Sequence, residues 1–315
     1  MIWLSWRQHR GALFGALALL AALGVVLMTH GVAMHQAYDR DGVEACQLLM
    51  FGGVEATTEA SAEGPCFTIF DSFENRFASL PTNAAAWLPF LPMVVGMLLG
   101  APLLAREYEQ GTWQLVWTQG VTRTRWLATK LAAVLGGVVT VTVLFAAGVS
   151  WWFEPMSPHR FSPEKFNHAV PVFTGYVLVA LAIGILAGVL LRRTLVAAAV
   201  TIPAYLAVRL TTEFGLRPRY REPLSTTDPA EAVGGWIIQD VIFTPSPDGP
   251  VLASGTIDYH PDDRFWQFQA IETTILVVLA AVLLAIAWRV VLGRGPRVHD
   301  VRRDPSVSVS SSPLP

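Results

Sequence analysis

Charged side chains within long apolar segments are the residues of this chain with the clearest potential for chemistry. Arg209 and Glu272 each fall within ~2 helical turns of the end of such a segment, and Glu213 follows Arg209 at the spacing of one helix face. Facing the interior of a helix bundle, these groups would form a polar patch at the mouth of a pathway. Alternatively, the long side chains reach back to the membrane surface and have no such role. No charge lies deeper in the segments, which argues against a proton-driven carrier.

Motifs for nucleotide binding and hydrolysis are absent from the sequence. It contains no G-x-x-x-x-G-K-[ST], G-x-S-x-G, H-E-x-x-H or C-x-x-C, and none of its 7 histidines is paired at the helical spacing of metal ligands. We therefore expect that the chain is not an enzyme, that it binds no metal or cofactor, and that any ATP and Mg²⁺ are bound by a partner.

The composition is typical of an integral membrane protein. Hydrophobic residues make up 53% of the chain and charged residues only 15%, and the formal net charge of −2 gives no indication of nucleic-acid binding. The apolar run from Gly11 to Met28 lacks a small-x-small cleavage site, so we interpret it as a retained span, with a signal peptide as the less favoured alternative.

Six apolar segments approach the ~20 residues that a membrane helix needs. They are Gly11–Thr29, Ala84–Ala105, Leu131–Trp152, Pro171–Leu191, Thr194–Thr212 and Phe268–Leu292. Only Arg192-Arg193 separates the fourth from the fifth, which predicts a tight helical hairpin. The predicted fold is an all-α polytopic membrane protein, with a permease domain over residues 1–303 and a disordered Ser/Pro-rich tail over 304–315.

The distribution of basic residues predicts the orientation of the spans. Arginine and lysine cluster before span one, between spans two and three, between spans four and five, and after span six. The positive-inside rule then places both termini in the cytoplasm of a plasma-membrane protein. Two long loops, at about 30–83 and 213–267, are left outside. Cys46 and Cys66 both lie in the first of these loops, where the oxidising environment predicts a disulfide between them.

The segment between spans two and three predicts a short amphipathic helix at the membrane surface. Trp113, Val116 and Trp117 lie on one apolar face, and the acidic residues Glu107 and Glu109 precede them. Pairs of glycines four residues apart occur at Gly11/Gly15, Gly96/Gly100 and Gly184/Gly188. Such pairs let helices approach closely, either within one chain or between two chains.

The same segment resembles the cytoplasmic segment of ABC-2-type ABC transporter permeases. The similar residues are Ala105–Thr112, Leu115, Trp117-Thr118-Gln119, Arg123, Arg125-Trp126 and Lys130, and Ile2–Arg10 is similar to the start of the actinobacterial exporter subunits. The resemblance implies an N-terminal elbow helix, six spans, and a coupling helix that docks on a separate ATPase subunit. It also implies a second permease chain, identical or paralogous, that pairs with this one through small-residue faces, which the resemblance places on spans one and five. The expected coupling residues are Arg106, Glu107, Glu109, Gly111, Thr112, Trp113, Trp117, Arg123 and Arg125.

Three function classes follow from these features. We favour the permease of an exporter, and the scarcity of deep charge favours a hydrophobic or amphipathic substrate. The alternatives are a membrane-bound enzyme or immunity protein acting at the outer surface, and a structural or sensory membrane subunit without a transport pathway. The sequence shows neither the converging catalytic groups of an enzyme nor the cytoplasmic domain of a sensor. A neighbouring reading frame with Walker motifs would separate the first class from the others.

Overall fold

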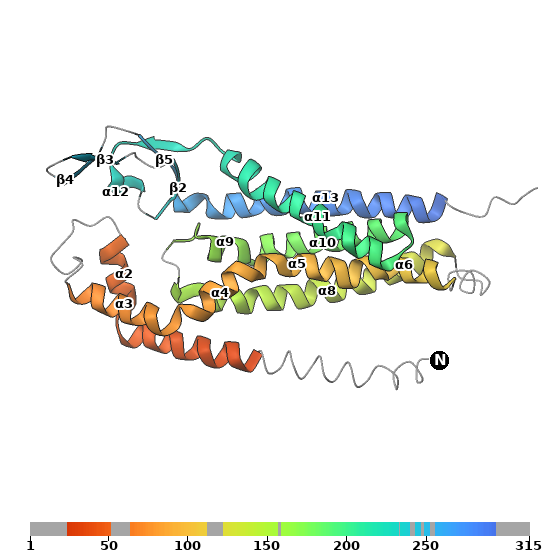
Figure 1. Ribbon diagram of the computed structural model, residues 1–315, viewed down its shortest axis with the longest axis horizontal. Coiled ribbons are helices and arrows are strands. Elements are labelled where there is room, and N and C mark those ends of the chain that lie inside the picture. The colour runs from red at the N-terminus through yellow and green to blue at the C-terminus, as the bar shows by residue number, and fades with distance from the viewer. Residues whose placement is uncertain are drawn as a thin grey trace, which may run out of the picture.

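The computed structural model describes residues 24–51, 64–111, 122–156, 159–232, 234–239, 243–246, 249–252 and 256–293. Long helices lie alongside one another in an elongated bundle (Figure 1). At one end, called the sheet end here, short helices and strands extend beyond the bundle. At the other end, called the hairpin end, α6 (Ala101–Gln110) finishes close to the turn between α10 (Val170–Leu191) and α11 (Thr194–Leu210).

Five helical segments of the described residues are long and apolar enough to cross a membrane. They are Ser79–Gln110, Arg123–Met156, Val170–Leu191, Thr194–Arg219 and Asp262–Gly293. They contain predicted spans two to six and mostly extend beyond the predicted limits, because polar residues continue the helices past the apolar runs. Predicted span one lies largely outside the described residues, although 24–40 are helical. The count of six spans therefore stays a prediction.

The first of these segments is irregular. It consists of α4 (Ser79–Trp87), η1 (Leu88–Phe90), α5 (Leu91–Val95), a π-helical turn η2 (Gly96–Gly100) and α6. Prolines at positions 81, 89, 92 and 102 lack the backbone N–H that a regular helix needs, which accounts for part of the irregularity.

The helix α10 lies at the centre of the bundle and packs against α6, α11, α13 (Phe265–Gly293) and α8 (Arg123–Phe153). A Cβ atom on Gly184 would collide with the carbonyl oxygen of Gly96, and one on Gly100 would lie 2.7 Å from the carbonyl oxygen of Leu181. The glycine pairs at 96/100 and 184/188 thus pack on each other within the chain. These two faces are consequently not available for the dimer contact that the sequence left open.

The first predicted loop folds into helices at the sheet end. The helical residues 24–40 turn at Gly42, which has a positive φ of 67°, into α2 (Val43–Phe51), and α3 (Pro65–Phe77) packs on α2. The predicted disulfide is present, since Cys46 of α2 is bonded to Cys66 of α3. It joins the two helices beside a cluster that includes Met34, Phe73, Phe77, Trp152 and Phe153.

The second predicted loop contains short strands, while the long apolar segments are all helical, which is consistent with the predicted all-α polytopic membrane protein. It runs through η4 (Thr211–Leu216), η5 (Arg217–Arg219), β1 (Leu224–Thr226), α12 (Pro229–Ala232), β2 (Trp236–Gln239), β3 (Phe243–Ser246), β4 (Gly249–Leu252), β5 (Ile257–His260) and η6 (Asp262–Arg264). Strands β1, β5 and β2 form an antiparallel sheet in that order, and β3 pairs with β4. The short helices η3 (Glu154–Met156) and α9 (Pro163–His168) complete the sheet end.

Several predicted features lie outside the described residues. They are the elbow helix at Ile2–Arg10, the Gly11/Gly15 pair, the helix at 113–117 and the tail at 304–315. The predicted orientation of the termini and the limits of the permease domain also stay predictions.

Candidate functional site

A buried ion pair between Glu272 and Arg217 is the centre of a polar network at the sheet end. The Nε and Nη2 atoms of Arg217 donate to the two Glu272 carboxylate oxygens, each over 2.8 Å. The Tyr176 hydroxyl donates to the same carboxylate over 2.8 Å, and the Tyr220 hydroxyl over 3.4 Å. Glu272 is 0% exposed. A carboxylate removed from solvent in this way needs the charge and the hydrogen bonds that these partners supply.

Glu213 extends the network to a second arginine. It lies 3.1 Å from Arg209 and 3.7 Å from Arg217, both measured between side-chain N and O atoms. Asn167 of α9 donates to Glu213 over 3.3 Å and accepts from Arg217 over 3.0 Å. The four charged residues come from α11, η4, η5 and α13, and their two positive and two negative charges balance. The network therefore links helices and carries no unpaired charge that could bind a ligand.

The network differs from the predicted outer patch in its burial and its membership. Arg209, Glu213 and Glu272 belong to one network through Arg217, and Arg209 and Glu272 are buried. A role at the mouth of a pathway stays a prediction. Arg217 was missed because the predicted span ended at Thr212. The sequence does contain a pattern that identifies Arg217, because the charged residues Arg209, Glu213 and Arg217 are spaced four apart, as on one face of a helix. No sequence signal identifies the tyrosines or Asn167, which come from other elements.

His168 adjoins this region at the end of α9. Its Nδ1 atom lies 2.7 Å from the carbonyl oxygen of Glu164, and its ring stacks on Phe153 with centroids 5.0 Å apart. Burial lowers the pKa of His168 to about 4, because the low-dielectric surroundings disfavour the imidazolium form. The ring is therefore neutral at physiological pH.

At the hairpin end, the predicted coupling residues Glu107 and Glu109 contact two different spans. The Lys130 ammonium donates to Glu107, which joins α6 to α8. Glu109 accepts from the backbone N–H and from the hydroxyl of Thr194, over 2.8 and 2.7 Å, which joins α6 to α11. The sequence predicted that these carboxylates face a soluble partner, and it gave no indication of either contact within the chain.

The other predicted coupling residues are partly described. Arg106 and Arg125 are exposed, Arg123 is half-buried, and Gly111 ends α6 with a φ of 67°, in the left-handed region that favours glycine. The Arg192 guanidinium lies 5.4 Å from the centre of the Tyr108 ring. Thr112, Trp113 and Trp117 fall outside the described residues.

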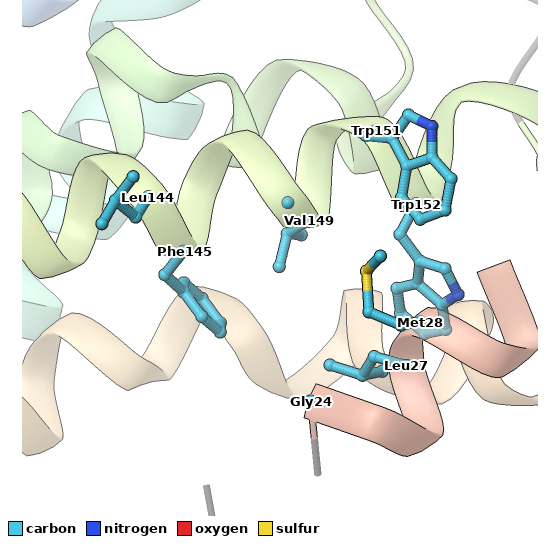
Figure 2. A pocket seen from close by; sticks show the side chains of 9 residues that line it. Gly24, Leu27, Met28, Leu144, Phe145, Val149, Trp151 and Trp152 are labelled. Atoms are coloured by element: carbon cyan, nitrogen blue, oxygen red, sulfur yellow. The ribbon is translucent and has the colours of Figure 1, made fainter. Parts of the chain in front are cut away.

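An apolar groove lies between the first helix and α8, in the half of the bundle nearer the sheet end. Gly24, Leu27 and Met28 line one wall, and Leu144, Phe145, Gly148, Val149, Trp151 and Trp152 line the other, around a volume of about 160 Å³. Figure 2 shows Leu27 and Met28 approaching Trp152 across the groove. The Trp152 indole N–H donates to His30 over 3.2 Å, so its polar atom is satisfied outside the apolar lining. In the described part of the chain, no three His, Cys, Asp or Glu side chains gather as metal ligands would.

A comparison with models of protein families gives a match. The model of the family described as ABC-2 membrane transporter related matches residues 17–217, which is well over half of the chain. No curated protein and no solved structure matches it. The matched range includes both carboxylates at the hairpin end and ends at Arg217.

Proposed function

We propose, because this chain belongs to the ABC-2 membrane transporter related family, that it is the permease subunit of an exporter driven by ATP hydrolysis on a separate ATPase chain. The family match is the observation that carries this conclusion, and the five apolar helices fit a multi-pass membrane protein. We infer further that the termini face the cytoplasm, that a second permease chain completes the pathway, and that the substrate is hydrophobic or amphipathic.

The ATPase would bind at the hairpin end, around residues 106–125. A permease without its own nucleotide site has to receive work through contact with a moving partner. The contact affects the spans only if it differs between the partner's states. Support comes from the exposed cations Arg106 and Arg125, which stand where the ends of three spans meet. Cations at such a position can attract an acidic surface of a soluble protein.

The test is co-purification with the ATPase of the neighbouring reading frame that carries Walker motifs. We expect wild-type permease to retain this ATPase in mild detergent and to raise its vanadate-sensitive ATP hydrolysis in proteoliposomes. Combined Arg106→Glu and Arg125→Glu substitutions should lower its recovery at least tenfold. Arg40→Glu, at an exposed position of the sheet end, is the matched control and should leave recovery unchanged.

Loss of recovery in both charge-reversal variants would mean that the effect is not local to the hairpin end. Unaltered recovery in both would place the docking surface elsewhere. If wild-type permease neither retains the ATPase nor changes its hydrolysis, the function is not that of an ATPase-driven permease.

A further inference from the structure

We propose that Glu109 is a positioning residue that carries movement of residues 106–125 directly to span five, which begins with α11. The proposal rests on the permease function proposed above, since it assigns a route to movements that an ATPase imposes. The covalent chain connects residues 106–125 to spans two and three only. The Glu109–Thr194 contact adds a third span, 85 residues further along the sequence.

The contact completes the N-terminus of α11, which lacks a cap of its own. Thr194 is the first residue of the helix, so no carbonyl of the same helix accepts from its N–H. The preceding residue, Arg193, supplies no side-chain cap. Glu109 accepts from both the N–H and the hydroxyl of Thr194, and its negative charge lies at the positive end of the helix dipole. The first turn of α11 thus depends on a carboxylate from α6.

The two sides of the contact differ in how firmly they are held. On the α6 side, Ala101 packs so closely on Gly188 that no Cβ fits there, which fixes α6 against α10. On the α11 side, Leu195 is 85% exposed, and the buried contacts near the start of the helix come from small side chains such as Ala197. Alanine side chains bury little apolar area, so the apolar contribution at this end of α11 is small. The two hydrogen bonds from Glu109 therefore have the larger part in deciding where span five begins.

The position of Glu109 suits transmission from the proposed docking segment. It lies in the last turn of α6, two residues before Gly111, where the chain leaves the helix. The neighbouring Tyr108 ring lies beside Arg192, which is in the turn between α10 and α11. Two consecutive residues of α6, Tyr108 and Glu109, therefore contact the α10–α11 hairpin. A shift of the end of α6 would consequently displace the start of α11.

The experiment compares reporters on two spans. The only two cysteines of the chain are bonded to each other, so a cysteine introduced at Val200 of α11 or at Val141 of α8 can be labelled alone. Both positions are exposed. Each labelled permease, with an environment-sensitive fluorophore, is reconstituted with the ATPase, and Mg-ATP with vanadate is added. We expect both labels to respond in the wild-type background.

In a Glu109→Ala background, we expect the label at 200 to lose at least half of its response and the label at 141 to keep its own. Thr194→Val, which removes the hydroxyl from the other side of the contact, should have the same but smaller effect. The double variant should resemble Glu109→Ala alone. Glu109→Gln, which retains an acceptor for the Thr194 N–H, should restore most of the response.

The outcomes separate this inference from the function on which it rests. Undiminished responses of both labels in Glu109→Ala would overturn the inference and leave the permease function intact. Equal loss at both labels would also overturn it, since Glu109 would then act on the partner contact as a whole. No response of either label in the wild-type complex would instead contradict the proposed function. If Glu109→Ala fails to accumulate, Thr194→Val tests the same contact.

Discussion

The polar clusters at the two ends of the bundle are built on opposite principles. At the sheet end, Arg209, Glu213, Arg217 and Glu272 alternate in charge, share partners and are mostly buried. At the hairpin end, Glu107 and Glu109 each contact one neighbouring residue and remain partly open to solvent. A buried, shared network is costly to open, because every broken bond leaves a desolvated charge. An isolated contact near water costs less free energy to break, because water can hydrogen-bond to the separated groups. The comparison indicates that the sheet end fastens the helices and that the hairpin end is the part suited to move.

The largest expected effect follows from removing one member of the buried network. Glu272→Ala leaves Arg217 desolvated without its bidentate partner, and it leaves the Tyr176 hydroxyl without its acceptor. We expect a loss of about 3–5 kcal/mol in the free energy of unfolding, measured by denaturation in mild detergent. Membrane abundance should fall accordingly.

The control for this prediction replaces both charges by apolar side chains of similar size. The pair Glu272→Met with Arg217→Met should recover most of the lost stability, because no uncompensated charge remains. If Glu272→Ala alone were as stable as wild type, water would have to reach the carboxylate site, and the contrast between the two ends would not hold.

The next effect concerns the pH dependence of the sheet end. Because the pKa of His168 is lowered to about 4, the unfolded chain binds a proton below its ordinary pKa of 6.5 while the folded chain does not. Stability from this group is therefore complete above about pH 6.5 and is lost as the pH falls towards 4, by about 3 kcal/mol in all. Between pH 7.5 and 5.0, unfolding free energies should differ by about 2 kcal/mol from His168 alone.

The variant His168→Gln should remove that part of the pH dependence. A smaller slope should persist, because burial also lowers the pKa values of His30, His159 and His260. A slope as steep as that of wild type would show that His168 is accessible to water. The hairpin-end contacts contain no histidine, so their stability should not change over this range.

The Cys46–Cys66 disulfide is a covalent link at the sheet end, and removing it tests how much that link contributes to stability. Cys46→Ser with Cys66→Ser opens a link between residues 20 apart and should lower the free energy of unfolding by about 3 kcal/mol, mainly through the greater freedom of the unfolded chain. The readout is unfolding of oxidised and reduced wild type beside the double variant. Reduction should destabilise the wild type and leave the variant unchanged.

What the sequence predicts and what it misses differ for physical reasons. Spans two to six follow from apolar length alone, and the Cys46–Cys66 bond follows from two thiols in one loop that is predicted to lie outside the cytoplasm. The pair Arg209–Glu213 is visible as a helical spacing. The contacts Glu109–Thr194 and Glu272–Arg217 join residues 85 and 55 apart, and no local pattern encodes such a distance. The strands between residues 224 and 260 are three or four residues long, too short to establish a periodicity of two.

The smallest expected effect concerns the Glu107–Lys130 pair, and it sharpens the comparison most directly. Both side chains are about one quarter exposed, at 24% and 23%, so solvent screens their attraction. A double-mutant cycle with Glu107→Gln and Lys130→Met should give a coupling energy of about 1 kcal/mol or less, whereas a cycle on Glu272 and Arg217 should give several times more. A coupling energy for Glu107–Lys130 as large as that of the buried pair would mean that the hairpin end is fastened as well. In that case spans two and three would move as one body, and the Glu109 contact would link span five to that body.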